Sequence, residues 1–287
     1  MKAPLAGQRI LVTGASRGIG REVAIRLSRD GADLVIVSRN REALDEVLGE
    51  LEPGNHAALP FDVCDSSAWQ SAIDTIAPDG HLSGVVTAAA IVTPIGLLGS
   101  WDIGEFRHTL DVNVVGTLLA VETTVKQLVA NHGSVVAFSG GGATGPFPRY
   151  DAYAASKAAV ARLVENLAVG LAPDGVRVNC VAPGFVLTDM HQATLIAGGD
   201  RAGNEYFDRT ARAIESGEGD SPALAADLVS FLLSGASAPI TGKLISARWD
   251  PWKDERFRAR LAQDADFGTL RRIDGQFFDT LGAGEAS

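Results

Sequence analysis

The chain has 287 residues, of which 46% are hydrophobic, and it carries a net charge of −10. This charge argues against a nucleic-acid surface, which needs basic patches, and no apolar run is long enough to span a membrane. The start of the chain lacks the apolar core of a secretory signal. Its two cysteines, Cys64 and Cys180, lie in strand-like surroundings and read as buried thiols. The histidines form no metal-ligand spacing, so we expect a cytoplasmic protein without a metal site.

The first strand and the turn after it predict a nucleotide-binding site. Arg9 to Val12 is a short apolar strand, and the glycine-rich segment Thr13–Gly20 leads from it into a helical pattern. Glycines let the backbone approach a pyrophosphate, and the free N–H groups at a helix start carry partial positive charge. From this turn we expect the cofactor contacts to be Gly14, Ser16, Arg17, Gly18, Ile19 and Gly20.

The second strand, Ala32 to Val37, indicates which cofactor is bound. It ends in Ser38 and Arg39, without the acidic residue that would bind a ribose 2′-hydroxyl and favour NAD(H). The guanidinium groups of Arg17 and Arg39 suit a 2′-phosphate, so NADP(H) is favoured over NAD(H). The alternative is that both arginines are simply solvated.

Two further strands continue the pattern, Ala57 to Phe61 and Gly84 to Thr87. In a parallel sheet the residues that follow each strand meet at the carboxyl edge, where a dinucleotide lies. A carboxylate there could accept a hydrogen bond from the adenine amino group, and small residues leave room for the cofactor. The expected contacts are Asp62, Val63, Ala89 and Ala90.

A tyrosine and a lysine one helical turn apart form the candidate catalytic pair. The strand Gly133 to Phe138 leads to Ser139, and an apolar helical pattern then carries Tyr153 and Lys157 on one face. A cation beside a phenol lowers the pKa of the phenol, so the pair could exchange a proton with an alcohol or carbonyl oxygen. A surface pair without function is the alternative, because this spacing is common by chance.

The remaining segments complete an alternation of strands and helices. Trp101–Asn131 is predicted to be largely helical, and Asn113 inside it could cap, kink or hold a water in the helix. Val176 to Val181 is a strand, Asp189 to Gly219 is expected to be an irregular substrate loop or lid, and a helix (Ala223–Leu233) and a strand (Lys243–Ala247) follow. We expect four cofactor contacts after the sixth strand: Pro183, Gly184, Val186 and Thr188.

This alternation predicts an α/β fold with a doubly wound parallel sheet, helices on both faces and the site at the strands' carboxyl ends. From about Gln8 to Ala247 the chain resembles the short-chain dehydrogenase/reductase family. The resemblance rests on four segments in the right order: Thr13–Gly20, Asn113–Gly116, Tyr153–Lys157 and Pro183–Thr188. It implies a single-domain Rossmann fold with seven strands, an NAD(P) cofactor, a small-molecule alcohol or ketone as substrate, and a homodimer or homotetramer.

By position, the resemblance implies that Tyr153 is the general acid and that Lys157 lowers its pKa and holds the nicotinamide ribose. Asn113 would hold a water that links Lys157 to solvent, and Thr188 would contact the cofactor. Two departures stand out. Thr87 to Ala90 replaces the family's Asn-Asn-Ala-Gly, and Gly140 occupies the place of the substrate-orienting serine. We expect Ser139 to take that role, with Thr144 as the substitute.

Two other functions stay open on the sequence. One is a sugar or cyclitol dehydrogenase, or an epimerase-like variant, with tightly held NAD(P). The other is a cofactor-binding sensor or scaffold that has lost activity. We place the catalytic domain at residues 1–247. Residues 248–287 form an extension whose six aromatic residues predict packing on the core or on a neighbouring subunit; they are Trp249, Trp252, Phe257, Phe267, Phe277 and Phe278.

Overall fold

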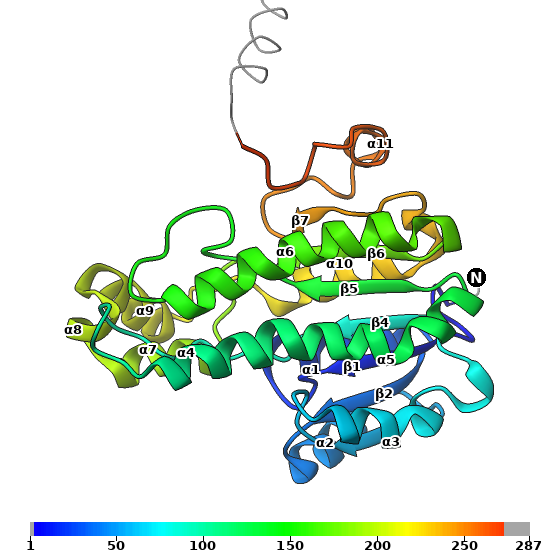
Figure 1. The fold of residues 1–287 in the computed structure, drawn as a ribbon, viewed down its shortest axis with the longest axis horizontal. Helices are drawn as coiled ribbons and strands as arrows, with labels where there is room; N and C mark the ends of the chain where they lie inside the picture. Colours follow the sequence, from blue (N-terminus) through cyan, green and yellow to red (C-terminus); the bar gives the residue numbers. More distant parts are fainter. Residues whose placement is uncertain (1–2, 273–287) are drawn as a thin grey trace, which may run out of the picture.

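The computed structural model describes residues 3–272 and contains a seven-stranded parallel sheet in the order β3-β2-β1-β4-β5-β6-β7 (Figure 1). Each strand lies within one residue of the position predicted for it. The strand order reverses between β1 and β4, which opens a crevice at the carboxyl ends of these two strands. The strands are β1 (Arg9–Thr13), β2 (Asp33–Ser38), β3 (Ala57–Pro60), β4 (Gly84–Thr87), β5 (Ser134–Phe138), β6 (Arg177–Ala182) and β7 (Leu244–Ser246).

Helices cover both faces of the sheet, as expected. Successive strand residues such as Ile10 and Leu11 enter opposite apolar clusters, because side chains alternate along a strand. One cluster includes α1 (Gly18–Arg29), α2 (Arg41–Leu48) and α10 (Pro222–Leu233), and the other includes α3 (Ser66–Ile76), α5 (Gly116–Ala130) and α6 (Asp151–Leu171).

Among residues 3–272, no helix has the length and apolar character needed to cross a membrane.

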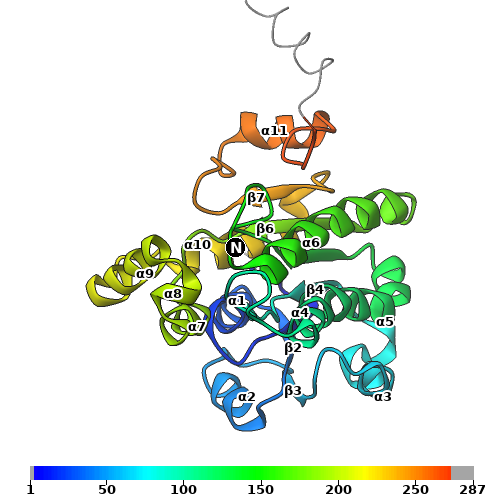
Figure 2. The same ribbon diagram turned by 60° about the vertical axis from the view of Figure 1, so that its left-hand side comes forward.

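The segment that we expected to be irregular is helical. It forms α7 (Asp189–Ala197), α8 (Gly199–Ala202) and α9 (Asn204–Ser216), which project beside α4 (Ile103–Leu110) at the carboxyl edge of the sheet (Figures 1 and 2). The expectation was wrong because the polar composition conceals an amphipathic spacing. Tyr206, Thr210 and Ala213 share one face of α9, and the last two are buried.

Residues 248–272 pack against the same core as α1 and α10. Trp252 is only 8% exposed, and Leu261 of α11 (Glu255–Gln263) is 1% exposed. The Leu244 N–H of β7 donates to the Gly268 carbonyl at 2.7 Å, so this segment runs beside the last strand (Figure 2). Trp249 remains largely exposed. Phe277 and Phe278 lie outside the described residues.

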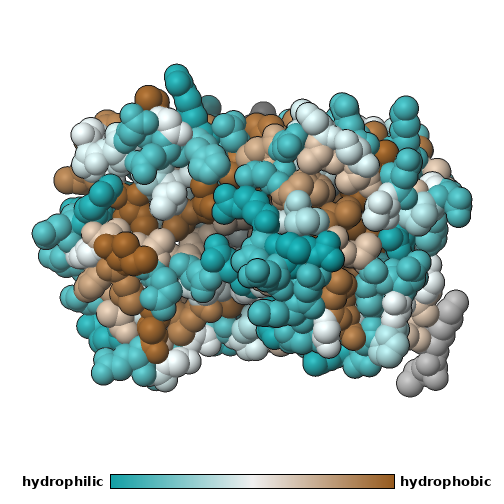
Figure 3. Space-filling view, turned by 90° about the horizontal axis from the view of Figure 1, so that it is seen from below, coloured by the Kyte–Doolittle hydropathy of each residue, from teal (hydrophilic) through white to brown (hydrophobic). Residues whose placement is uncertain are grey.

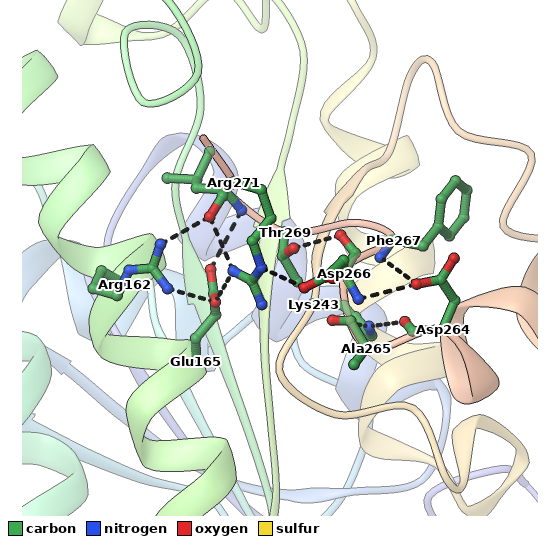
Figure 4. Close-up of polar contacts among 10 residues, drawn as sticks. Arg162, Glu165, Lys243, Asp264, Ala265, Asp266, Phe267, Thr269 and Arg271 are labelled. Atoms are coloured by element: carbon green, nitrogen blue, oxygen red, sulfur yellow. Dashed lines mark hydrogen bonds and ion pairs between the residues drawn. The ribbon is translucent and has the colours of Figure 1, made fainter. Parts of the chain in front are cut away.

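Charged contacts hold this segment to α6 and β7 (Figure 4). Glu165 of α6, 11% exposed, accepts hydrogen bonds from Arg162 at 2.7 Å and from Arg271 at 2.6 Å. Lys243, immediately before β7, is buried, and burial lowers the pKa of its ammonium group. It donates to two carbonyls, those of Asp264 and Ala265.

Candidate active site

The glycine turn after β1 is tightly packed, because glycines let backbone segments approach where a side chain would not fit. A Cβ on Gly14 would lie 2.5 Å from the Ala89 nitrogen, and one on Gly20 would overlap the Gly14 carbonyl. Helix α1 begins at Gly18 without a side-chain cap and without an acidic residue in its first turn. Its first N–H groups are therefore free of side-chain partners, which fits an anionic ligand.

A cleft of about 950 Å³ lies over this turn, at the switch point between β1 and β4. Its size and its position fit a dinucleotide. Phe61 and the start of α2 also line it, and neither was among the expected cofactor contacts. Of the expected cofactor residues, those on the cleft are Gly14, Ser16, Arg17, Gly18, Ile19, Gly20, Ser38, Arg39, Asp62, Val63, Ala89, Ala90 and Thr188. Those outside it are Tyr153, Lys157, Pro183, Gly184 and Val186.

The two arginines assigned to a 2′-phosphate each have a carboxylate partner. Arg17 Nη1 lies 2.7 Å from Asp189 Oδ2, and Arg39 Nη1 lies 3.8 Å from Asp62 Oδ2. Both arginine side chains are about two-thirds exposed, at 67% and 64%. Asp189 was not among the expected site residues, because its place across the cleft from Arg17 depends on the fold.

Tyr153 and Lys157 lie one turn apart near the start of α6. Lys157 Nζ is 5.5 Å from the centre of the Tyr153 ring and donates to the Phe138 carbonyl at 3.0 Å. Burial lowers the pKa of Lys157 to about 8. We expected Lys157 to lower the pKa of Tyr153, but burial raises that pKa and the nearby Tyr206 phenol adds to the effect. The Lys157 ammonium group is directed at the Phe138 carbonyl and does not offset the effect of burial on the pKa of Tyr153.

Asn113 lies in a π-helical turn, Asp111–Val115, between α4 and α5. Its Oδ1 accepts from the Ile91 N–H at 2.8 Å, and its Nδ2 donates to the Ile91 carbonyl at 2.9 Å and to Ser156 Oγ at 2.8 Å. Asn113 thus joins the chain after β4 to α6. Its amide reaches Ser156 and not Lys157. Such turns are frequent at functional sites.

Ser139 does not have the geometry that we expected of a substrate-orienting hydroxyl. Its side chain is 2% exposed, and its Oγ donates to the Lys157 carbonyl at 2.9 Å. A hydroxyl has one proton to donate, so this one cannot donate to a substrate while it binds Lys157. A Cβ on Gly140, where the family has its serine, would lie 3.7 Å from Pro183 Cδ, and the substitute Thr144 is exposed.

An aromatic cluster adjoins Tyr153, and the sequence analysis missed it. The rings of Phe147 and Tyr150 are stacked with centres 4.3 Å apart, and Tyr206 packs edge-on against them at 5.0 and 5.3 Å. Phe147 also lies 6.4 Å from the Tyr153 ring. These residues come from a loop and from α9, so only the helical spacing around Tyr206 could have indicated part of the cluster.

The cleft and this cluster share lining residues. Val92, Met190 and Ala193 line the cleft and also pack in the apolar cluster that contains Tyr153. A ligand in the cleft would therefore touch side chains that belong to the same apolar cluster as Tyr153.

Comparisons with known proteins agree with this architecture. A family model described as enoyl-(acyl carrier protein) reductase matches residues 14–247. Dehydrogenase/reductase SDR family member 4 of Sus scrofa is 33% identical over 249 residues, covering 85% of this chain and 87% of the relative. The (3R)-3-hydroxyacyl-CoA dehydrogenase of Homo sapiens is 33% identical over 245 residues, covering 81% and 90%.

Two solved structures share the fold. A dehydrogenase/reductase from Sinorhizobium meliloti 1021 is 30% identical, with a TM-score of 0.74, and the match covers 85% of this chain and 95% of that one. Carveol dehydrogenase from Mycobacterium avium, solved in complex with NAD, is 26% identical, with a TM-score of 0.74 and coverage of 85% and 97%. The chain therefore belongs to the short-chain dehydrogenase/reductase family of NAD(P)-dependent oxidoreductases.

Proposed function

We propose that the protein interconverts a secondary alcohol and a ketone with NADP(H), and that Tyr153 is the general acid and base. The observation that carries the proposal is the Tyr153–Lys157 pair on α6, packed against residues that also line the dinucleotide cleft. The relatives named carveol dehydrogenase and (3R)-3-hydroxyacyl-CoA dehydrogenase support the same type of reaction here.

The bound cofactor would supply or accept the hydride, and this chain would position the substrate and handle the proton. The raised pKa of Tyr153 keeps its hydroxyl protonated at neutral pH, ready to donate to a carbonyl oxygen. Lys157 has a pKa of about 8 and holds a proton at pH 7. Its positive charge would stabilise the phenolate that remains after the donation.

The choice of NADP(H) is supported by the charges around the cleft. Strand β2 is followed by Arg39 without an acidic residue, and Arg17 lies in the glycine turn. Both side chains line the cleft. A 2′-phosphate would gain two guanidinium partners there, whereas a 2′-hydroxyl has no carboxylate partner at the end of β2.

An apolar substrate of small or medium size is supported by the surroundings of Tyr153. Phe147, Tyr150 and Tyr206 form its aromatic border. Exposed apolar side chains also gather at the end of the molecule that carries α4 and α7, beside a hollow in the surface (Figure 3). They are Leu97, Leu98, Ile103 and Ile196.

The test is NADPH consumption against a panel of ketones by the wild type, Tyr153→Phe and the matched control Tyr150→Phe. Tyr150→Phe keeps the ring that borders the site and removes only a buried hydroxyl that binds Thr194 at 2.9 Å, so it should leave the reaction intact. We expect turnover to vanish only in Tyr153→Phe, with NADPH binding retained. Equal turnover in Tyr153→Phe and the wild type would refute the mechanism. NADPH binding without turnover of any ketone would favour the sensor alternative.

We also propose that the protein is a homodimer or homotetramer built on α5 and α6. Apolar side chains on these helices support this assembly, since Val169 is 78% exposed and Leu118 is 41% exposed. Light scattering on the purified chain would test it, and a mass of about 30 kDa would contradict it.

A further inference from the structure

An ion pair joins the two walls of the dinucleotide cleft. Arg17 immediately precedes α1 in the glycine turn, and Asp189 is the first residue of α7. Arg17 Nη1 lies 2.7 Å from Asp189 Oδ2, and both residues line the cleft. The walls also meet at the neighbouring positions, where a Cβ on Gly18 would lie 3.3 Å from Thr188 Cγ2.

This pair is poorly suited to a purely structural role. Its side chains are 67% and 62% exposed, and an exposed pair changes an equilibrium by a factor of roughly two to five. Arg17 is, however, one of the three arginines that line the cleft, with Arg39 and Arg41, and it is available to a phosphate group of the coenzyme. A guanidinium that holds a carboxylate has fewer donors free for a phosphate.

Within residues 3–272, the carboxylate of Asp189 has a single hydrogen-bond partner, Arg17. Asp62, the partner of Arg39, differs from it. The Asp62 pair is longer, at 3.8 Å, and its carboxylate also accepts the Cys64 N–H at 2.9 Å, which shapes the turn after β3. Of these two carboxylates, Asp189 is therefore the one whose charge can be changed without the loss of a backbone hydrogen bond.

We propose that Asp189 is a specificity-determining residue for the coenzyme, because its carboxylate competes with the 2′-phosphate for Arg17. When the phosphate binds, Arg17 leaves Asp189 and the link between the glycine turn and the α7–α9 segment is broken. The competition weakens NADPH binding but has little effect on NADH, which lacks the 2′-phosphate. The inference rests on the proposed use of NADP(H).

Asp189→Asn should change the affinity for NADPH but not the affinity for NADH. Removal of the competing charge should tighten NADPH binding about three-fold and leave NADH binding nearly unchanged. The ratio of the two affinities is the criterion, because loss of a negative charge near the cleft favours any anionic ligand. The gain should shrink at about 1 M salt, where the Debye length falls to about 3 Å.

Glu50→Gln is the matched control. Glu50 pairs with Arg21 of α1, both side chains are 40% exposed, and neither residue lines the cleft. This substitution also removes one exposed carboxylate from an arginine partner, but outside the cleft. In an Arg17→Gln background, Asp189→Asn should no longer change the affinity ratio, which closes a double-mutant cycle.

The experiment is a calorimetric or fluorescence titration of the full chain with NADPH and with NADH, for each variant. The criterion is the affinity for NADPH divided by the affinity for NADH. The proposal is supported if this ratio rises in Asp189→Asn, stays unchanged in Glu50→Gln, and does not respond to Asp189→Asn in the Arg17→Gln background. A ratio that Asp189→Asn leaves unchanged, in a wild type that prefers NADPH, would overturn this inference alone. A wild type that prefers NADH would overturn the coenzyme choice of the proposed function and this inference with it.

Discussion

Replacement of Lys157 by methionine should stabilise the free protein at neutral pH. The side chain is 4% exposed, and burial disfavours its charged form. Methionine has a similar length and no charge to desolvate. The substitution removes the hydrogen bond to the Phe138 carbonyl, which offsets about 1 kcal/mol of the gain.

The size of the effect follows from the pKa of Lys157. A fall from the ordinary value of 10.5 to about 8 corresponds to a cost of about 3 kcal/mol in the folded state at low pH. Between pH 8 and 10.5 the unfolded chain binds more protons than the folded one, so the free energy of unfolding of the wild type rises with pH. The advantage of Lys157→Met should therefore shrink by roughly 2 kcal/mol between pH 7 and pH 9.5.

Urea denaturation of both proteins at these two pH values, without coenzyme, measures this change. Groups other than Lys157 titrate in both proteins and cancel in the comparison. Lys157→Arg is the control, because a guanidinium stays charged over this range, and it should show no gain at pH 7. A stability difference between Lys157→Met and the wild type that does not change with pH would refute the reasoning.

Two further substitutions test other contacts. Ser139→Ala should lower the free energy of unfolding by about 1 kcal/mol, since a buried hydrogen bond is lost, and keep turnover of a good ketone within a few-fold of wild type. A loss near 100-fold would instead identify Ser139 as the substrate-orienting hydroxyl. Glu165→Gln should cost about 1 kcal/mol in urea denaturation, because Arg162 and Arg271 lose a shared carboxylate; an unchanged midpoint would mean that the contacts in Figure 4 add nothing.

The fold was predictable because its signals are local and repeated. Strands buried on both faces appear as continuous apolar runs, such as Leu34–Val37, and helices between them show their own spacing. The glycine turn was equally readable. A Cβ at Gly14 or Gly20 would clash with neighbouring backbone, so the positions that the sequence marks as glycine are those where the backbone must come close.

The details of the site were less predictable, because they depend on side-chain direction and on contacts between distant segments. The position of Ser139 after a strand predicted the correct edge of the sheet. It could not show that the Ser139 hydroxyl donates to the Lys157 carbonyl. The helical spacing put Lys157 beside Tyr153 but gave no measure of their burial, which decides the pKa values of both groups. Asp189 meets Arg17 across 172 residues, and no local pattern predicts such a contact.

The chain shields its own last strand. A strand at the edge of a sheet offers unpaired N–H and C=O groups to other chains and can seed aggregation. In β7, the Leu244 N–H is already bound to Gly268, and the neighbouring Lys243 is tied to the same segment. An expression boundary placed after residue 247 would uncover this edge and remove Trp252 from the core. Residues 248–272 therefore cover the β7 edge against pairing with a strand of another chain, and recombinant work should keep them.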